Sequence, residues 1–133
     1  MNATATTTAT VYVVDDDPAI RRALPRLLRS AGINTVAFDS LASLLEADLK
    51  TEDACVVADI RLKGEDGLAL PRLLAERNLK LPVVFLTAVD STDIRERAIH
   101  AGGAAFFRKP VDDLALIDSI RWVLAAGGGR RTR

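Results

Sequence analysis

The sequence predicts an α/β fold in which helices cover both faces of a doubly wound, parallel sheet of five strands. Short apolar stretches typical of strands alternate five times with stretches whose apolar residues recur at helical spacing. Residues 55–58 are continuously apolar, as expected of a central parallel strand that is covered on both faces. Five successive strand–helix units imply right-handed crossovers between parallel strands.

The first strand–helix unit occupies about residues 11–31. An apolar strand over 11–14 precedes Pro18, which fits the first turn of a helix. Pro25 lies inside this helix, and we expect a kink or a frayed turn there because an interior proline costs about 3 kcal/mol. Gly32 is expected to end the helix in the left-handed conformation.

The second and third units follow the same pattern. A strand over 33–38 leads to Ser40, which is expected to cap a helix that continues to Leu49. The third strand, 55–58, leads through a polar loop to a helix predicted for residues 66–77.

The fourth and fifth units complete the predicted sheet. The fourth strand is expected at 81–86, and the helix after it ends near Ala101, where two glycines break the pattern. The fifth strand is expected at 104–107 and the last helix at 111–126.

We expect one domain over residues 10–126, because 133 residues are too few for two ordinary domains. Residues 1–9 are predicted to be a disordered leader, and residues 127–133 a flexible tail of Gly and Arg. The leader lacks the basic start and the apolar stretch of a signal peptide. No stretch approaches the roughly eighteen apolar residues of a membrane span, so we expect a cytoplasmic protein without membrane contact.

Composition and charge exclude several classes of function. Eighteen basic residues balance eighteen acidic ones, so we expect no direct nucleic-acid binding by this domain. Cys55 is the only cysteine, which excludes a disulfide within the chain and favours a small buried hydrophobe. His100, the only histidine, is expected at the surface. Trp122 could be a partial core residue or an interface anchor, and we favour the core.

Polar residues follow four of the predicted strands. Asp15, Asp16 and Asp17 come after the first strand, Asp59 after the third, Thr87 after the fourth and Lys109 after the fifth. Ligands of parallel α/β sheets bind outside the carboxyl ends of the strands, so these side chains are expected to converge on one site. Carboxylates, one hydroxyl and one ammonium suit a metal ion and a phosphoryl group.

Asp15, Asp16 and Asp59 are the candidate ligands of Mg²⁺. Two carboxylates about 4 Å apart repel by about 4 kcal/mol at a surface-like dielectric, and a divalent cation removes that cost. Mg²⁺ prefers oxygen ligands and needs only one or two carboxylates besides phosphate oxygens and waters. The alternative for these aspartates is helix capping, a role that Asp17 before Pro18 suits.

Asp59 is also a candidate nucleophile towards phosphorus, which would give an aspartyl phosphate. Lys109 could stabilise the charge on the phosphoryl group, and Thr87 could hydrogen-bond one of its oxygens. Taken singly, Lys109 could equally be a surface charge and Thr87 a β-branched strand residue.

Four stretches, in this order, resemble the motifs of the receiver domain of two-component response regulators, and the resemblance covers residues 10–126. They are Val-Val-Asp-Asp-Asp at 13–17, Asp59 followed by Asp66-Gly67, Leu-Thr-Ala at 86–88 and Phe-Phe-Arg-Lys-Pro at 106–110. Each stretch alone is weak, but four in order at family spacings are specific. The resemblance implies a flavodoxin-like (βα)5 sheet with strand order 2-1-3-4-5.

The resemblance also implies roles for the acidic residues. Asp59 would be the phosphoacceptor, and a sensor histidine kinase or a phosphotransfer protein would be the donor. Mg²⁺ would be held by Asp15, Asp16, Asp59 and the backbone carbonyl of Arg61.

The remaining motif residues would form a switch. Lys109 would contact the phosphoryl group, and the Lys109–Pro110 bond would be cis, as is usual in the family. Thr87, the switch hydroxyl, would move towards the phosphoryl group and let Phe106, the switch aromatic, turn inward. The face built from the fourth helix, fifth strand and last helix would then regulate an output domain or effector, or form a homodimer.

One stretch departs from the family pattern. Leu62-Lys63 stands where receivers commonly have Met-Pro, and Gly64-Glu65 follows it. The loop beside the site thereby loses the stiffening of proline and gains charge, which bears on its mobility and on the lifetime of the phosphorylated state.

Two other classes of function are alternatives to the receiver interpretation. A phosphatase-type enzyme with an Asp nucleophile would share the carboxylates and the lysine, but it would need a cap or substrate pocket for which this chain has no spare residues. A mononucleotide or flavin binder would need a Gly-rich or Ser/Thr-rich loop after the first strand. Three aspartates at that place would repel phosphate unless a metal intervened.

Overall fold

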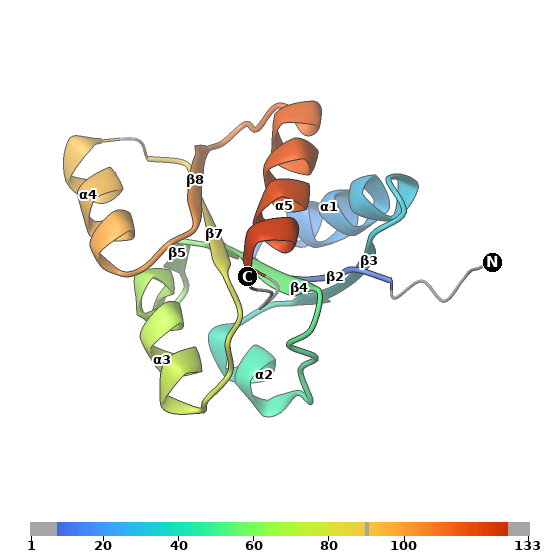
Figure 1. The fold of residues 1–133 in the computed structure, drawn as a ribbon. Helices are drawn as coiled ribbons and strands as arrows, with labels where there is room; N and C mark the ends of the chain where they lie inside the picture. The colour runs from blue at the N-terminus through green and yellow to red at the C-terminus, as the bar shows by residue number, and fades with distance from the viewer. Residues whose placement is uncertain (1–7, 90, 128–133) are drawn as a thin grey trace.

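A computed structural model describes residues 8–89 and 91–127 and contains one five-stranded parallel sheet (Figure 1). Its strands are β2 (Thr10–Val14), β3 (Asn34–Phe38), β4 (Ala54–Asp59), β7 (Val83–Thr87) and β8 (Ala105–Arg108). They lie in the order β3-β2-β4-β7-β8, and every neighbouring pair is parallel. Counted along the chain, this is the order 2-1-3-4-5, so the predicted doubly wound fold is confirmed.

Helices cover both faces of the sheet. They are α1 (Pro18–Ser30), α2 (Leu41–Glu46), the short 3-10 helix η1 (Gly67–Ala69), α3 (Leu70–Glu76), α4 (Thr92–His100) and α5 (Asp113–Gly127). Figure 1 shows α1 and α5 on one side of the sheet and α2, α3 and α4 on the other. This is the layering that right-handed crossovers on both sides of a parallel sheet produce.

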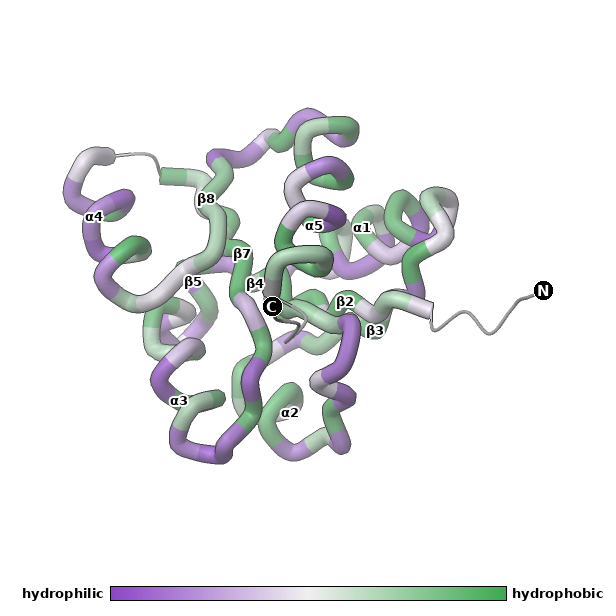
Figure 2. Tube along the Cα trace, viewed as in Figure 1, coloured by the Kyte–Doolittle hydropathy of each residue, from purple (hydrophilic) through white to green (hydrophobic). Residues whose placement is uncertain are grey.

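The sheet separates two clusters of buried apolar side chains. One cluster joins alternate strand residues to α2, α3 and α4, and the other joins the intervening residues to α1 and α5. All six residues of β4 are buried, which explains the continuous apolar run that precedes Asp59 in this strand (Figure 2). Cys55 on β4 is fully buried, and burial raises the pKa of its thiol to about 12.

Side chains and backbone conformation at the helix ends agree with the sequence. Asp17 caps α1 by accepting a hydrogen bond from the Ala19 N–H at 2.9 Å. Ser40 and Ser91 cap α2 and α4 in the same manner. Gly32 has φ +83, the left-handed conformation expected after α1.

Three helix predictions differ from the structure. The helix predicted from Ser40 to Leu49 ends at Glu46, because Ala47 is already extended, with φ −82 and ψ 158. The helix predicted for 66–77 begins as the 3-10 turn η1 and becomes α-helical only at Leu70. Of the kink or frayed turn expected at Pro25, the frayed turn is not found, since α1 is helical from Pro18 to Ser30; the kink stays a prediction.

A small hairpin beside the carboxyl end of β4 was not predicted. Its strands, β5 (Arg61–Leu62) and β6 (Glu65–Asp66), are antiparallel and are joined by Lys63 and Gly64. Gly64, the second residue of the turn, has φ +71, a conformation that glycine adopts without strain. Strands of only two residues leave no period in the sequence, so the stretch reads as a polar loop.

Two surface residues test the predicted core. His100 is exposed, as expected. Trp122 is 72% exposed, so its predicted place in the core is wrong. The buried stripe of α5 consists of Leu116, Ile117, Ile120, Val123 and Leu124. Trp122 falls outside that stripe, because residues three and four apart share a helix face and residues two apart do not.

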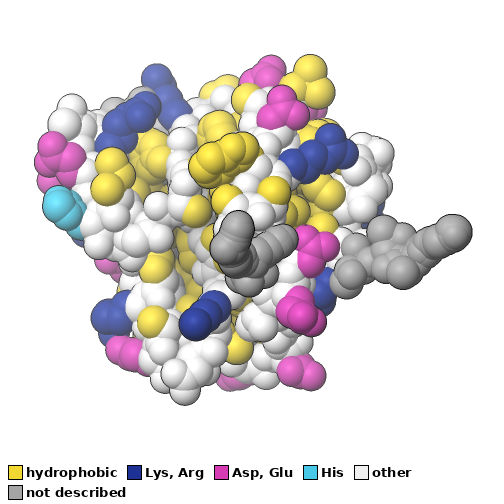
Figure 3. All heavy atoms as spheres, in the orientation of Figure 1, with side chains coloured by type: hydrophobic (Ala, Val, Ile, Leu, Met, Phe, Trp, Pro, Cys, Tyr) yellow, Lys and Arg dark blue, Asp and Glu magenta, His cyan; other side chains and the backbone are white. Residues whose placement is uncertain are grey.

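The described surface carries interspersed charges. Figure 3 shows basic and acidic side chains scattered among polar and apolar ones on the face that it presents. No helix within residues 8–89 and 91–127 is long and apolar enough to cross a membrane. The predicted leader and tail fall largely on residues 1–7 and 128–133, which lie outside the described residues.

Candidate functional site

The four predicted strand ends meet at one edge of the sheet. Asp15 directly follows β2, Asp59 ends β4, Thr87 ends β7 and Lys109 directly follows β8. The strand register places the ends of β7 and β8 at the same edge as the end of β4, since Asp59 pairs with Leu86 and Thr87 pairs with Arg108. The sheet therefore brings together groups that are far apart in the sequence.

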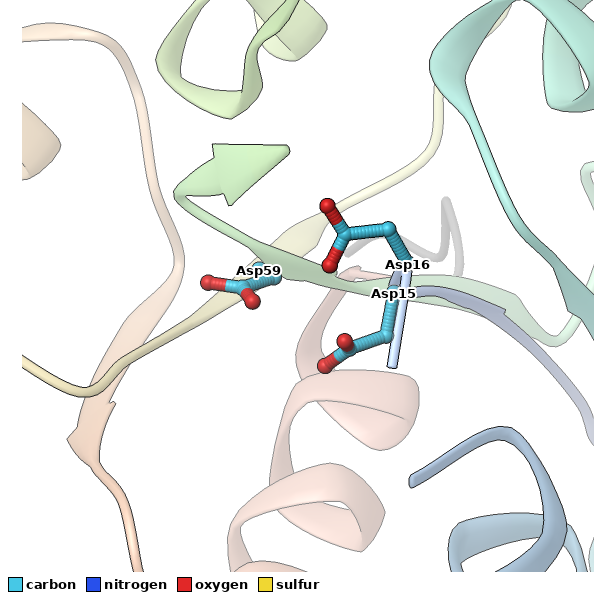
Figure 4. Close-up of side chains that lie close together, drawn as sticks. All are labelled: Asp15, Asp16 and Asp59. Atoms are coloured by element: carbon cyan, nitrogen blue, oxygen red, sulfur yellow. The ribbon is translucent and has the colours of Figure 1, made fainter. Parts of the chain in front are cut away.

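Three carboxylates form an acidic cluster at this edge (Figure 4). Asp15, Asp16 and Asp59 each offer one oxygen, and these oxygens all lie within 4.8 Å of one another. Asp15 is 1% exposed and Asp59 8% exposed, whereas Asp16 is partly exposed. The cluster therefore opens to solvent on the side of Asp16.

Lys109 neutralises part of this cluster. Its Nζ donates to Asp15 Oδ2 at 2.8 Å and to Asp59 Oδ2 at 3.0 Å. Its side chain is 20% exposed, so these ion pairs are shielded from water. Lys109 is thus an inward-facing group of the site, and the surface-charge alternative is wrong.

Burial and ion pairing both change the titration of this pair. Burial raises the pKa of Asp59, and the hydrogen bonds from Lys109 and from the Arg61 N–H offset this only in part. Burial alone would lower the pKa of Lys109, but its bonds to Asp15 and Asp59 raise it above the ordinary value. Lys109 therefore remains a cation at neutral pH.

Main-chain N–H groups hold each of the three carboxylates. Asp15 Oδ1 accepts from Asp17 N at 2.9 Å, and Asp59 Oδ1 accepts from Arg61 N at 3.1 Å. Asp16 Oδ2 accepts from Lys63 N, in the turn of the β5–β6 hairpin, at 2.8 Å. Sequence reasoning missed these donors, because every residue except proline has an N–H and the residue type does not show where it points.

The residues expected to form the switch lie on neighbouring strands. Thr87 is 1% exposed, and its Oγ1 accepts a hydrogen bond from Val89 N at 3.1 Å. Phe106 on β8 is half-buried, and the Arg95 guanidinium of α4 lies 5.1 Å from the centre of its ring. The Phe106 ring thus already contacts α4, and the Thr87 side chain is buried at the end of β7. The Lys109–Pro110 bond is cis, as the resemblance implied.

The cluster fits a hard divalent cation. Its donors are all oxygens, which Mg²⁺ prefers, and Asp16 keeps a carboxylate oxygen that no N–H of the described residues occupies. The need for positive charge is visible in Lys109, which already bridges two of the acids. Arg61 begins β5 next to the cluster, and its side chain is exposed.

Comparison with known proteins identifies relatives of the whole described region. A family model described as the response regulator receiver domain matches residues 11–121. The chain is 37% identical over 126 residues to the transcriptional regulatory protein TdiR of Thauera aromatica, covering 94% of this chain and 56% of TdiR. It is 35% identical over 111 residues to FixJ of Azorhizobium caulinodans, covering 84% of this chain and 53% of FixJ. The chain thus spans about half the length of these relatives.

Solved structures agree with this match. The response regulator StyR superimposes with a TM-score of 0.80 at 37% identity, covering 91% of this chain and 61% of that chain. A response regulator receiver protein from Burkholderia phymatum gives a TM-score of 0.76 at 36% identity, covering 89% of this chain and 96% of that one. The family match, the shared fold and the acidic cluster at the strand ends lead to one conclusion: this chain belongs to the receiver domain family of response regulators.

Proposed function

We propose that this domain is a phosphorylation-activated switch in which Asp59 accepts a phosphoryl group in a Mg²⁺-dependent reaction. One observation carries the proposal: the Asp59 side chain, 11% exposed, forms an ion pair with the Lys109 ammonium and lies in one cluster with two further carboxylates. That arrangement places a nucleophile, a cation and a set of metal ligands around one point. A sensor histidine kinase or a phosphotransfer protein is the proposed donor.

The proposed reaction is a direct phosphoryl transfer. A carboxylate oxygen of Asp59 forms a bond to phosphorus while the bond between phosphorus and the donor's leaving atom breaks, and the leaving group keeps that electron pair. Lys109 contacts an oxygen of the transferred group, and Thr87 donates its hydroxyl hydrogen to another. Lys109 has to exchange its bond to Asp59 for one to the phosphoryl oxygen, and its bond to Asp15 keeps it in place meanwhile.

Asp15, Asp16, Asp59 and the backbone carbonyl of Arg61 are the proposed ligands of Mg²⁺. When bound, the ion would supply positive charge that neutralises the oxygens of the transferring group. Without it, three carboxylates and a phosphoryl group would share one Lys109 cation.

The proposed readout runs from Thr87 to Phe106. Movement of Thr87 towards the phosphoryl group breaks the bond from Val89 N and frees space for the Phe106 ring. An inward turn of the ring removes it from Arg95 and changes the face formed by α4, β8 and α5. Phosphorylation shifts this equilibrium by favouring the inward state.

The proposed partners follow from this face. TdiR and FixJ are named transcriptional regulatory proteins, and the region matched by this chain covers only 56% and 53% of their lengths, which supports an output domain or effector as the target. A homodimer through the α4, β8 and α5 face is the second proposed assembly. Ile99 on α4 and Leu114 on α5 are 71% and 72% exposed, which supplies apolar surface for such contacts. We propose that the domain acts in the cytoplasm and binds no nucleic acid itself.

Phosphorylation is tested by intact mass measurement after incubation with acetyl phosphate and Mg²⁺. The wild type is expected to gain one phosphoryl group, and Asp59→Asn, which keeps the shape but not the nucleophile, is expected to gain none. Chelation of Mg²⁺ is expected to abolish the gain in the wild type. Equal modification of both proteins, or of neither, contradicts the proposal. A phosphatase-type enzyme, the alternative, receives no support from the family match.

A further inference from the structure

The β5–β6 hairpin is tied to the rest of the domain at both of its edges. At its turn, Lys63 N donates to Asp16 Oδ2 at 2.8 Å. At the start of β6, the Glu65 carboxylate accepts from Leu41 N at 2.7 Å and from Ala42 N at 3.2 Å, both in the first turn of α2. The stretch in which this chain departs from its family is therefore anchored, and one anchor reaches the acidic cluster.

The anchor at Asp16 depends on the residue type at position 63. A proline there, as receivers commonly have, has no N–H and could not make this bond. Lys63 does not have a positive φ, since Asp53 and Asn78 are the non-glycine residues described with one. Gly64, with φ +71, follows it, and this order of signs is that of a type II turn, which accepts proline at its first central position. The turn thus tolerates proline, while the hydrogen bond does not.

Asp16 needs this bond more than its neighbours do. Lys109 fixes Asp15 and Asp59, but Asp16 forms no ion pair with any part of the chain that the structure describes. Asp16 is also the most open of the three carboxylates. Its orientation towards the cluster therefore rests on the Lys63 N–H, which occupies Oδ2 and leaves Oδ1 available.

We propose that the main-chain N–H of Lys63 is a positioning group that holds the Asp16 carboxylate ready for a divalent cation, in place of the proline that receivers commonly have at this position. The inference rests on the proposed function, because it assigns Asp16 to the metal. Hydrogen bonds that orient a metal ligand commonly change metal affinity by about 10- to 100-fold when they are removed. A carboxylate already held in place loses less freedom when the ion binds.

Two variants at one position isolate the N–H. Lys63→Pro removes both the lysine side chain and the N–H, whereas Lys63→Ala removes the side chain alone. We expect Lys63→Pro to bind Mg²⁺ about tenfold more weakly than Lys63→Ala in isothermal titration calorimetry. Lys63→Ala is expected to bind within about twofold of the wild type, since no ion pair of the Lys63 side chain is seen among the described residues. Equal affinity of the two variants overturns the proposal.

A second comparison shows whether the effect passes through Asp16. In an Asp16→Ala background, replacing Lys63 by Pro instead of Ala is expected to change Mg²⁺ affinity less than twofold. A persistent tenfold difference would mean that proline acts through the hairpin as a whole, and would overturn the proposal. If the wild type itself binds no Mg²⁺, the proposed function fails, which is a result distinct from equal binding by the two variants.

A direct measurement covers the case in which Lys63→Pro does not fold. The Lys63 amide proton is expected to exchange slowly with solvent in the wild type, and this protection is expected to be lost in Asp16→Ala. Titration with Mg²⁺ is expected to shift its NMR resonance, because the bonded carboxylate then binds the ion. An amide that exchanges equally fast in both proteins, or that does not respond to Mg²⁺, would sink the idea.

Discussion

Lys109 holds two buried carboxylates that would otherwise repel each other. The side chains of its partners, Asp15 and Asp59, are at most 11% exposed, so water could not solvate these carboxylates well if the ammonium were removed. The proposed phosphoryl transfer and the stability of the domain thus depend on the same cation, Lys109. Removing the Lys109 ammonium should therefore impair both the reaction and the stability, and a divalent cation should restore the stability.

At the residue scale, we predict that Lys109→Met lowers the free energy of unfolding by about 2 kcal/mol in the absence of metal. The loss arises because two charged hydrogen bonds disappear and the carboxylates remain buried. Millimolar Mg²⁺ should raise the free energy of unfolding more in the variant than in the wild type. The ion binds the folded cluster in both proteins, but in the wild type Lys109 already neutralises part of it. Urea unfolding with and without Mg²⁺ measures both effects. Equal stabilisation of the two proteins by Mg²⁺ would contradict the prediction.

At the scale of elements, the β5–β6 hairpin depends on one close approach of backbone to backbone. Gly67 follows β6, and its N–H donates to the Ile60 carbonyl at 2.8 Å. A Cβ at position 67 would overlap the Asp59 carbonyl oxygen and approach Ile60 Cα within 2.9 Å. Gly67 of the Asp66-Gly67 motif is thus required for close packing against the end of β4.

We predict that Gly67→Ala costs roughly 2–3 kcal/mol of unfolding free energy, because backbone cannot give way as a flexible side chain can. Gly64→Ala is the matched control. A Cβ at Gly64 would meet no atom within 4 Å, so Gly64→Ala adds only the backbone strain of a φ of +71. We expect it to lower the free energy of unfolding by about 1 kcal/mol. Thermal unfolding of both variants provides the measurement. A smaller loss for Gly67→Ala than for Gly64→Ala would be the contrary result.

The same elements show which features a sequence can predict. The end of β4 was predictable because the strand is buried along its whole length, and a polar residue after such an apolar run has to lie where the strand reaches the edge of the sheet. The hairpin was not, since two strands of two residues carry no period. The early end of α2 could not be predicted from local pattern either, since the chain after the helix is held by a distant contact: Lys50 N donates to the Tyr12 hydroxyl at 2.7 Å, across 38 positions.

At the scale of the whole molecule, the proposed switch connects the site to the face of α4, β8 and α5. Phe106 lies between the apolar core and this face, since its side chain packs against the buried cluster of the α2, α3 and α4 layer and its ring lies 5.1 Å from the Arg95 guanidinium of α4. A change at Asp59 therefore has a physical route to that face through neighbouring strands of one sheet.

We predict that a phosphate analogue, beryllofluoride with Mg²⁺, shifts the NMR resonances of Phe106 and of residues 91–107. Resonances of α2 should move much less, because α2 lies far from β8 across the sheet order. Asp59→Asn is expected to show no such shifts. Binding of the analogue to the wild type with the resonances of residues 91–107 unchanged would rule out the switch.

The division of the interior into two side-chain clusters has a consequence for how such a domain can vary. Neighbouring residues of a strand, such as Cys55 and Val56, belong to opposite clusters and meet different helices. Substitutions on opposite sides of the sheet should accordingly have additive effects on stability, as for sites without shared partners. The layer of α1 and α5 and the layer of α2, α3 and α4 can therefore accept substitutions independently of one another.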